Sequence, residues 1–178
     1  MAPSLNQIGA ETGTDKSRHG YLPFYESHFK RENPRSLLEL GVLGGASLQM
    51  WKRYFPKCRV EGWDQEVRWD KKVVEGCKLK IVNLNSRAEI ENAADGAQWD
   101  VIIDDASHTM QQQQLTFSAL FEKSKFFVME DLHTSWSAAH KSSPTRRTTF
   151  DLVVNLGSGG RPWDAECASP EEAAYISR

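Results

Sequence analysis

Short apolar runs recur along the chain, separated by segments in which apolar positions follow helical spacing. The runs start near residues 37, 59, 79, 100 and 125, a spacing of about 20–25 residues. Strand-length runs alternating with helix-length segments predict repeated strand–helix units. We therefore expect a doubly wound, Rossmann-like α/β fold with about five parallel strands and helices on both faces.

Two helical patterns flank the first run. Tyr21, Tyr25 and Phe29 are spaced four apart, which places them on one face of a helix over residues 21–29. Such a helix is either a docking element or a cover over a substrate or cofactor. Residues 48–55 form a second helical pattern that ends before a proline.

The pattern changes after the fifth run. We expect one domain over residues 1–178, because this length suits a single core. Its predicted parts are an N-terminal cover at 1–35, a cofactor and metal core at 36–136, and C-terminal helices and loops at 137–178. Within the last part we expect loops at 137–144 and 157–162, a helix at 145–156, and a short helix from Ser169.

Composition and charge exclude several classes of function. The chain has 22 basic and 24 acidic groups, a net charge of −2, so no basic excess attracts nucleic acid. No stretch approaches the roughly 18 consecutive apolar residues that span a bilayer, and the N-terminus does not resemble a secretion signal. Cys58, Cys77 and Cys167 are odd in number and widely spaced, which favours a reducing, cytoplasmic location.

A glycine-rich turn follows the first run and leads into a helix. Its glycines allow close approach of a ligand to the backbone and expose the helix N-terminal amides. Asp64 ends the second run, where a nucleoside ribose would present its hydroxyls. The glycine spacing is wider than the dinucleotide fingerprint and suits a cofactor without pyrophosphate, although a tight turn needs glycine in any case. The candidate cofactor-binding residues are Glu39, Gly41, Gly44, Gly45, Ser47, Asp64, Asn83, Asn85 and Asp104.

Carboxylates and histidines end the fourth and fifth runs. Asp104-Asp105 and His108 follow the fourth run, and Glu130-Asp131 and His133 follow the fifth. A strand–helix–strand crossover brings both strand ends to one edge of a sheet. Carboxylates in one cleft repel each other unless a cation neutralises them, and oxygen ligands favour a hard ion such as Mg²⁺.

Helix capping is the alternative role for some of these acids. We favour it for Asp104, which together with Ser107 offers capping oxygens, and it stays open for Asp131. For Asp105, Glu130 and Asp131 taken together we favour a metal site. His108, on the first turn of the helix that follows, is a candidate general base because imidazole changes charge near neutral pH.

Six motifs carry a resemblance to a known family. They are GTDK at 13–16, HGYLPFYESHF at 19–29, LLELGVLGGASLQMW at 37–51, Asp64, IIDDASH at 102–108 and MEDLHTSW at 129–136. The chain resembles class I S-adenosylmethionine-dependent methyltransferases, and among them the metal-dependent O-methyltransferases that act on sugar hydroxyls of macrolides and related natural products.

The resemblance implies cofactors and roles for particular residues. It implies S-adenosylmethionine with Asn83 or Asn85 near its adenine, Mg²⁺ on Asp105, Glu130 and Asp131, and His108 as the base that deprotonates a small-molecule hydroxyl. His133 matches the family's EDLH but is better interpreted as structural. Ala106 stands where the family usually has glycine.

The sequence also departs from the family, whose sheet is completed by two further strands. With these C-terminal strands missing, the fifth strand would be an exposed apolar edge, so we expect a homodimer that covers it. Two rival hypotheses remain: a shortened member that binds cofactor or metal and acts by association, and a member that catalyses a different reaction.

Overall fold

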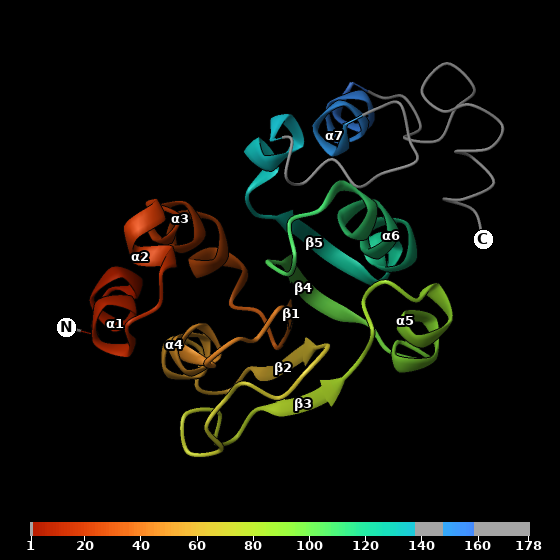
Figure 1. Ribbon diagram of the computed structural model, residues 1–178. Coiled ribbons are helices and arrows are strands. Elements are labelled where there is room, and N and C mark those ends of the chain that lie inside the picture. The colour runs from red at the N-terminus through yellow and green to blue at the C-terminus, as the bar shows by residue number, and fades with distance from the viewer. Residues whose placement is uncertain (1, 138–147, 159–178) are drawn as a thin grey trace, which may run out of the picture.

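A parallel five-stranded sheet forms the centre of the protein. The computed structural model describes residues 2–137 and 148–158, and its strand order is β3-β2-β1-β4-β5 (Figure 1). Every neighbouring pair is parallel, which confirms the predicted doubly wound fold. The strands are β1 Ser36–Leu40, β2 Arg59–Asp64, β3 Lys78–Ile81, β4 Trp99–Asp104 and β5 Ser124–Met129.

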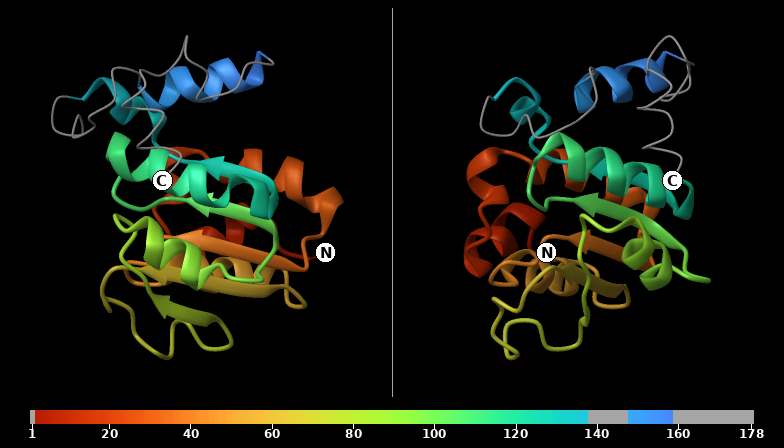
Figure 2. Two further views of the ribbon diagram at one scale, coloured as in Figure 1. Left: turned by 90° about the vertical axis from the view of Figure 1, so that its right-hand side faces the viewer. Right: turned by 45° about the vertical axis from the view of Figure 1, so that its right-hand side comes forward.

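Helices cover both faces of this sheet, as Figures 1 and 2 show. One face carries the N-terminal helices α1 Leu5–Thr12, α2 Lys16–His19 and α3 Leu22–Glu32, together with α4 Ala46–Tyr54. The opposite face carries α5 Arg87–Ala93 and α6 Met110–Leu120. The 3-10 helices η1 Phe121–Lys123 and η2 Leu132–Trp136 flank β5, and α7 Thr149–Gly157 contacts η2 and α6.

Successive side chains of the central strands face opposite cores, as the two-residue period of a strand requires. Leu37 of β1 packs with α1, α3 and α4, whereas Leu38 packs with α5 and α6. In β4, Val101 and Ile103 face the first core and Ile102 faces the second. Both faces of β1 and β4 are therefore buried, which explains why these strands appear in the sequence as continuous apolar runs.

The topology places a crevice where ligands bind in such folds. The strand order reverses at β1, which pairs with β2 on one side and β4 on the other. Ligands of doubly wound sheets bind outside the carboxyl ends of the strands at such a point. The glycine-rich turn after β1 and the polar residues after β2, β4 and β5 all lie at this edge.

Most predicted elements are confirmed. The five strands and the helices α3 and α4 match the expected segments, whereas α1 was not predicted because the first residues are mostly polar. The helix expected at 145–156 is observed as α7, Thr149–Gly157. Most of the loop at 137–144, the loop at 159–162, Cys167 and the helix from Ser169 lie outside the described residues. Among the described helices, none has the length and apolar character needed to cross a membrane.

Candidate functional site

The glycine turn after β1 brings two loops into close contact. Gly41 and Gly45 have φ angles of 89° and 86°, in the left-handed region that favours glycine. A Cβ atom on Gly41 would lie 2.2 Å from the carbonyl oxygen of Asp105. Only glycine therefore allows the turn after β1 to lie directly against the loop after β4.

The N-terminus of α4 faces the same space. Gly45 is its N-cap residue and supplies no side-chain oxygen to the first amides of the helix. Gly45, Ala46 and Ser47 line a cavity, so the unpaired amides and the positive end of the helix dipole are available to an anionic group.

Asp64, at the end of β2, holds the glycine turn in place. Its Oδ2 accepts hydrogen bonds from the amides of Val42 at 2.8 Å and Leu43 at 3.1 Å. Its Oδ1 accepts from the amide of Gln65 at 2.7 Å. A carboxylate oxygen can accept a second hydrogen bond, so Asp64 can still bind a ribose hydroxyl from the cavity.

A cavity of about 560 Å³ lies between these elements. Among the described residues, its lining carries four carboxylates, those of Asp15, Asp64, Glu66 and Asp105, and one guanidinium, that of Arg68. This balance favours a ligand with positive charge. The predicted site residues that line it are Gly41, Gly44, Gly45, Ser47, Asp64, Asp105 and His108.

Four other predicted cofactor residues do not line this cavity. Glu39 is fully buried and accepts a hydrogen bond from the indole of Trp51 at 2.9 Å. The Asn83 side chain accepts a hydrogen bond from the backbone amide of Asn85. The Asn85 side chain in turn donates a hydrogen bond to the Gln65 side chain. Asn85 and its neighbours thus form a polar rim beside Leu84, which does line the cavity. Cofactor contact by Glu39, Asn83, Asn85 and Asp104 stays a prediction.

Asp104 supports the loop after β4 from below. It is 2% exposed, accepts a hydrogen bond from the amide of Ala106 at 3.4 Å, and accepts another from the Thr116 hydroxyl of α6. Burial raises the pKa of the Asp104 carboxyl from 3.8 to about 7. Its partners are a loop amide and a side chain within α6, and the N-cap residue of α6 is Thr109. Asp104 therefore supports a turn and does not cap the helix, which corrects the capping role favoured from the sequence.

The acidic cluster at the ends of β4 and β5 contains a buried lysine. The ammonium of Lys16, 1% exposed, lies 2.8 Å from Oε1 of Glu130 and 3.3 Å from Oε1 of Glu39, and it donates a hydrogen bond to Oδ2 of Asp105. Burial raises the pKa of Glu130, and the charge of Lys16 opposes that rise. The cation that the cluster requires is thus partly supplied by the chain itself.

Two tyrosines from α3 and the residue before it also contact the cluster. The Tyr25 hydroxyl donates to Oε1 of Glu130, and the Tyr21 hydroxyl donates to Oδ1 of Asp131 at 2.5 Å. All three predicted metal ligands therefore accept a hydrogen bond from the N-terminal segment. The 21–29 helix is correctly predicted, and it contacts the candidate site directly.

His108 lies before α6, which corrects the expectation that it belongs to the first helical turn. The helix begins at Met110, and His108 has a φ angle of 57° in the preceding loop. The Thr134 hydroxyl of η2 donates to the His108 carbonyl at 2.9 Å and holds this conformation. The ring Nε2 lies 3.5 Å from Oδ2 of Asp131 and 3.9 Å from Oδ1 of Asp105.

These atoms form a group that fits a divalent cation. One ligand atom each from Asp105, His108 and Asp131 lies within 4.8 Å of the other two. The two carboxylates suit Mg²⁺, which binds few protein oxygens and keeps several waters. Glu130 lies beside this group, with its Oε1 bonded to Lys16 and Tyr25. His133 is 75% exposed at its side chain, with Nδ1 3.8 Å from Asp131.

Sequence reasoning missed Lys16, Tyr21 and Tyr25 as parts of this cluster. The GTDK motif at 13–16 contributes to the sequence analysis only through its family resemblance, yet it supplies both the buried ammonium and part of the cavity lining. A lysine next to an apolar, aromatic helix was the available signal. Its partners are distant in sequence, so pattern alone could not identify them.

Comparisons with known proteins identify several relatives of similar sequence. No family model matches the chain. It is 31% identical to 8-demethyl-8-(2-methoxy-alpha-L-rhamnosyl)-tetracenomycin-C 3'-O-methyltransferase of Streptomyces olivaceus over 85% of this chain and 43% of that protein. It is 32% identical to demethylmacrocin O-methyltransferase of Streptomyces fradiae over 75% of this chain and 38% of that protein.

Among solved structures, the fold matches the MycE methyltransferase of the mycinamycin pathway, determined in complex with Mg, SAH and mycinamycin VI. The TM-score is 0.78 at 26% identity, over 88% of this chain and 48% of the other. The chain thus matches between 38% and 48% of the length of these three relatives, which is less than half of each.

The close approach at Gly41 predicts a specific loss of stability. We expect Gly41→Ala to lower the free energy of unfolding by about 1–3 kcal/mol, because its Cβ meets the Asp105 carbonyl and its φ is positive. Gly44→Ala is the matched control, since no atom lies within 4 Å of its added Cβ. Urea denaturation measures both, and equal losses would contradict the interpretation.

The raised pKa of Asp104 predicts a pH dependence of stability. The folded chain keeps a proton on Asp104 that the unfolded chain releases above pH 3.8, so stability falls as pH rises towards about 7. Asp104→Asn should remove this contribution, at most about 1.4 kcal/mol per pH unit.

Urea titrations between pH 4 and pH 8 test this dependence. Asp100→Asn is the control, because hydrogen bonding to Lys125 lowers the pKa of Asp100, and this carboxylate stays ionised over most of that range. Identical slopes for Asp104→Asn and the natural chain would show that Asp104 does not titrate as stated.

Proposed function

We propose that this chain, which has the class I methyltransferase fold and is a homologue of natural-product sugar O-methyltransferases, transfers a methyl group from S-adenosylmethionine to a hydroxyl of a small molecule such as a sugar. One observation carries the proposal. A glycine-lined cavity with acidic walls opens directly onto Asp105 and His108, so a methyl donor and a deprotonating group would meet there.

The cavity residues would hold the cofactor, which supplies an electrophilic methyl group when bound. Asp64 would accept hydrogen bonds from the ribose hydroxyls. The free amides at the start of α4 would bind the carboxylate of the cofactor. The acidic lining favours the positive charges of the sulfonium and amino groups. Asn83 or Asn85, on the loop after β3, would approach the adenine.

Asp105, Glu130 and Asp131 would hold Mg²⁺, which when bound makes an acceptor hydroxyl more acidic. Asp105 and Asp131 turn oxygens towards His108, and Glu130 adds the third carboxylate from the adjacent position. Tyr21 and Tyr25 orient Asp131 and Glu130 through their hydroxyl groups. These three donors are all carboxylate oxygens, as Mg²⁺ prefers.

His108 would take the proton of the acceptor hydroxyl at its Nε2 atom. The imidazolium so formed lies 3.5 Å from Asp131, whose negative charge stabilises it. The His108 backbone is fixed by Thr134, so the ring enters the reaction already placed beside the cavity. Loss of this proton would leave the hydroxyl oxygen able to attack the methyl group in line, while the bond from that methyl to sulfur breaks and S-adenosylhomocysteine leaves.

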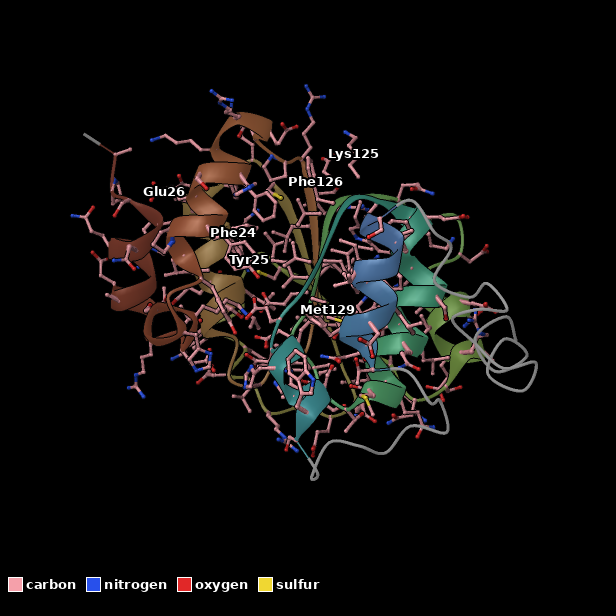
Figure 3. The ribbon with its side chains drawn as sticks, turned by 90° about the horizontal axis from the view of Figure 1, so that it is seen from above. Phe24, Tyr25, Glu26, Lys125, Phe126 and Met129 are labelled. Carbon is pink, nitrogen blue, oxygen red and sulfur yellow. The ribbon has the colours of Figure 1, made fainter. Side chains whose placement is uncertain are left out.

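We also propose a homodimer that covers the edge of β5. This strand is at the edge of the described sheet, and Figure 3 looks onto that edge, with α3 on one side and α6 and α7 on the other. Phe126 of β5 and Phe24 of α3 are 37% and 52% exposed. A second copy that covers these rings would remove an exposed apolar edge. The cytoplasmic location likewise stays a prediction.

Titration calorimetry tests the proposed function. We expect the chain to bind S-adenosylmethionine and S-adenosylhomocysteine, and His108→Ala to bind both nearly as well while losing transfer by about 10²–10⁴-fold, because only the proton acceptor is removed. Transfer is measured with radiolabelled cofactor on glycosylated natural products that carry free hydroxyls. The exposed His133→Ala should retain most activity.

Three outcomes would contradict this account in different ways. No binding of either compound, with or without Mg²⁺, would overturn the proposed function. Loss of binding in His108→Ala alone would show that the histidine is structural. Binding without transfer to any acceptor would favour a protein that acts by association.

Sedimentation velocity tests the dimer. We expect a species of twice the 20.2 kDa chain mass, and a shift to monomer in Phe126→Lys, which places a charge on the β5 edge. Val67→Lys, also at an exposed apolar residue but on the loop after β2, should leave the dimer intact. A monodisperse monomer whose β5 amides exchange freely would contradict the dimer.

A further inference from the structure

Lys16 occupies an unusual position for a lysine. Its side chain is 1% exposed, and its ammonium contacts carboxylates from three different strands' ends: Glu39 of β1, Asp105 after β4 and Glu130 after β5. Three carboxylates surround this one ammonium, so it provides a positive charge inside the cleft.

This ammonium uses oxygens that a divalent cation would need. Asp105 and Glu130 are two of the three proposed metal ligands, and Lys16 donates to one oxygen of each. The Glu130 oxygen also accepts the Tyr25 hydroxyl, so it already has two donors. In the described part of the cluster, the oxygens turned towards His108 are Oδ1 of Asp105 and Oδ2 of Asp131.

We propose that Lys16 is a resident counter-cation that competes with the divalent metal ion for Asp105 and Glu130. This inference rests on the metal site of the proposed function. Without any cation, the clustered carboxylates of Glu39, Asp105 and Glu130 would repel one another strongly, so Lys16 stabilises the metal-free chain. The same charge repels an incoming divalent ion and occupies its ligands, so it weakens metal binding.

The competition links the metal to the N-terminal segment. Lys16 begins α2, and the residues immediately before it, Gly13 to Asp15, line the cofactor cavity. An ion that takes over Asp105 and Glu130 releases the ammonium, and the cavity wall formed by residues 13–15 is then free to rearrange. Lys16 is thus a positioning residue that acts through two carboxylates.

Metal affinity distinguishes competition from mere support of the fold. Mn²⁺ binding is measured by electron paramagnetic resonance without cofactor, for the natural chain and for Lys16→Met. We expect the variant to bind Mn²⁺ at least about tenfold more tightly, because a charge in contact with the ligands is gone. A lysine that only supported the fold would give the opposite result, since its loss would disorder the ligands.

Lys57→Met is the matched control, because it removes the same charge from an exposed position. Its Mn²⁺ affinity should equal that of the natural chain. Unchanged or weaker binding in Lys16→Met contradicts the inference and leaves the proposed function intact. Absence of Mn²⁺ binding in both the natural chain and Lys16→Met contradicts the metal site as well, whereas S-adenosylhomocysteine binding tests the cofactor site separately.

A second pair of variants covers the case in which Lys16→Met does not fold. Glu39→Gln keeps an acceptor for the Trp51 indole. It also removes the buried carboxylate that the loss of Lys16 would otherwise leave unpaired. Lys16→Met in that background should bind Mn²⁺ more tightly than Glu39→Gln alone. If it is unfolded without metal, folding on addition of Mn²⁺ supports competition, and a chain that stays unfolded contradicts it.

Discussion

The structure depends on a concentration of negative charge at one edge of a parallel sheet. Strands β1, β4 and β5 lie side by side and are parallel and in register. Glu39, Asp105 and Glu130, near the carboxyl ends of these strands, therefore converge. Such a cluster is stable only beside positive charge. Lys16 brings that charge from the N-terminal segment, and the ion pairs thereby attach this segment to the open end of the sheet.

The same contacts join two sites that could otherwise be separate. Gly41 lets the turn after β1 lie against Asp105, so the wall of the glycine-lined cavity is also the support of a proposed metal ligand. His108 borders the cavity and faces Asp131, and Thr134 fixes its backbone. Methyl donor, metal and base would therefore share one cleft. The approach of Gly41 to the Asp105 backbone fixes the wall of the donor cavity, and the contact of Thr134 with the His108 backbone fixes the base.

Much of the fold and of the site's composition could be predicted from the sequence. The apolar runs of β1 and β4 are buried on both faces, and the acids that follow them must lie at one edge. Lys16 could not be predicted as the cluster's cation. Its burial depends on how α1 and α3 pack, and the carboxylates that it contacts are distant from it in sequence. The position of His108 depended on where α6 begins, and helix ends are the least certain part of any pattern.

The central claim is that Lys16 and a divalent ion share the same carboxylates, and a crystal structure grown with Mn²⁺ tests it most directly. Anomalous scattering at the manganese edge locates the ion. We expect one ion bound to Asp105, Glu130 and Asp131, with the Lys16 ammonium withdrawn from Asp105 and Glu130. A cleft without manganese at saturating concentration, or an ion bound there while Lys16 keeps its contacts to Asp105 and Glu130, would contradict the claim.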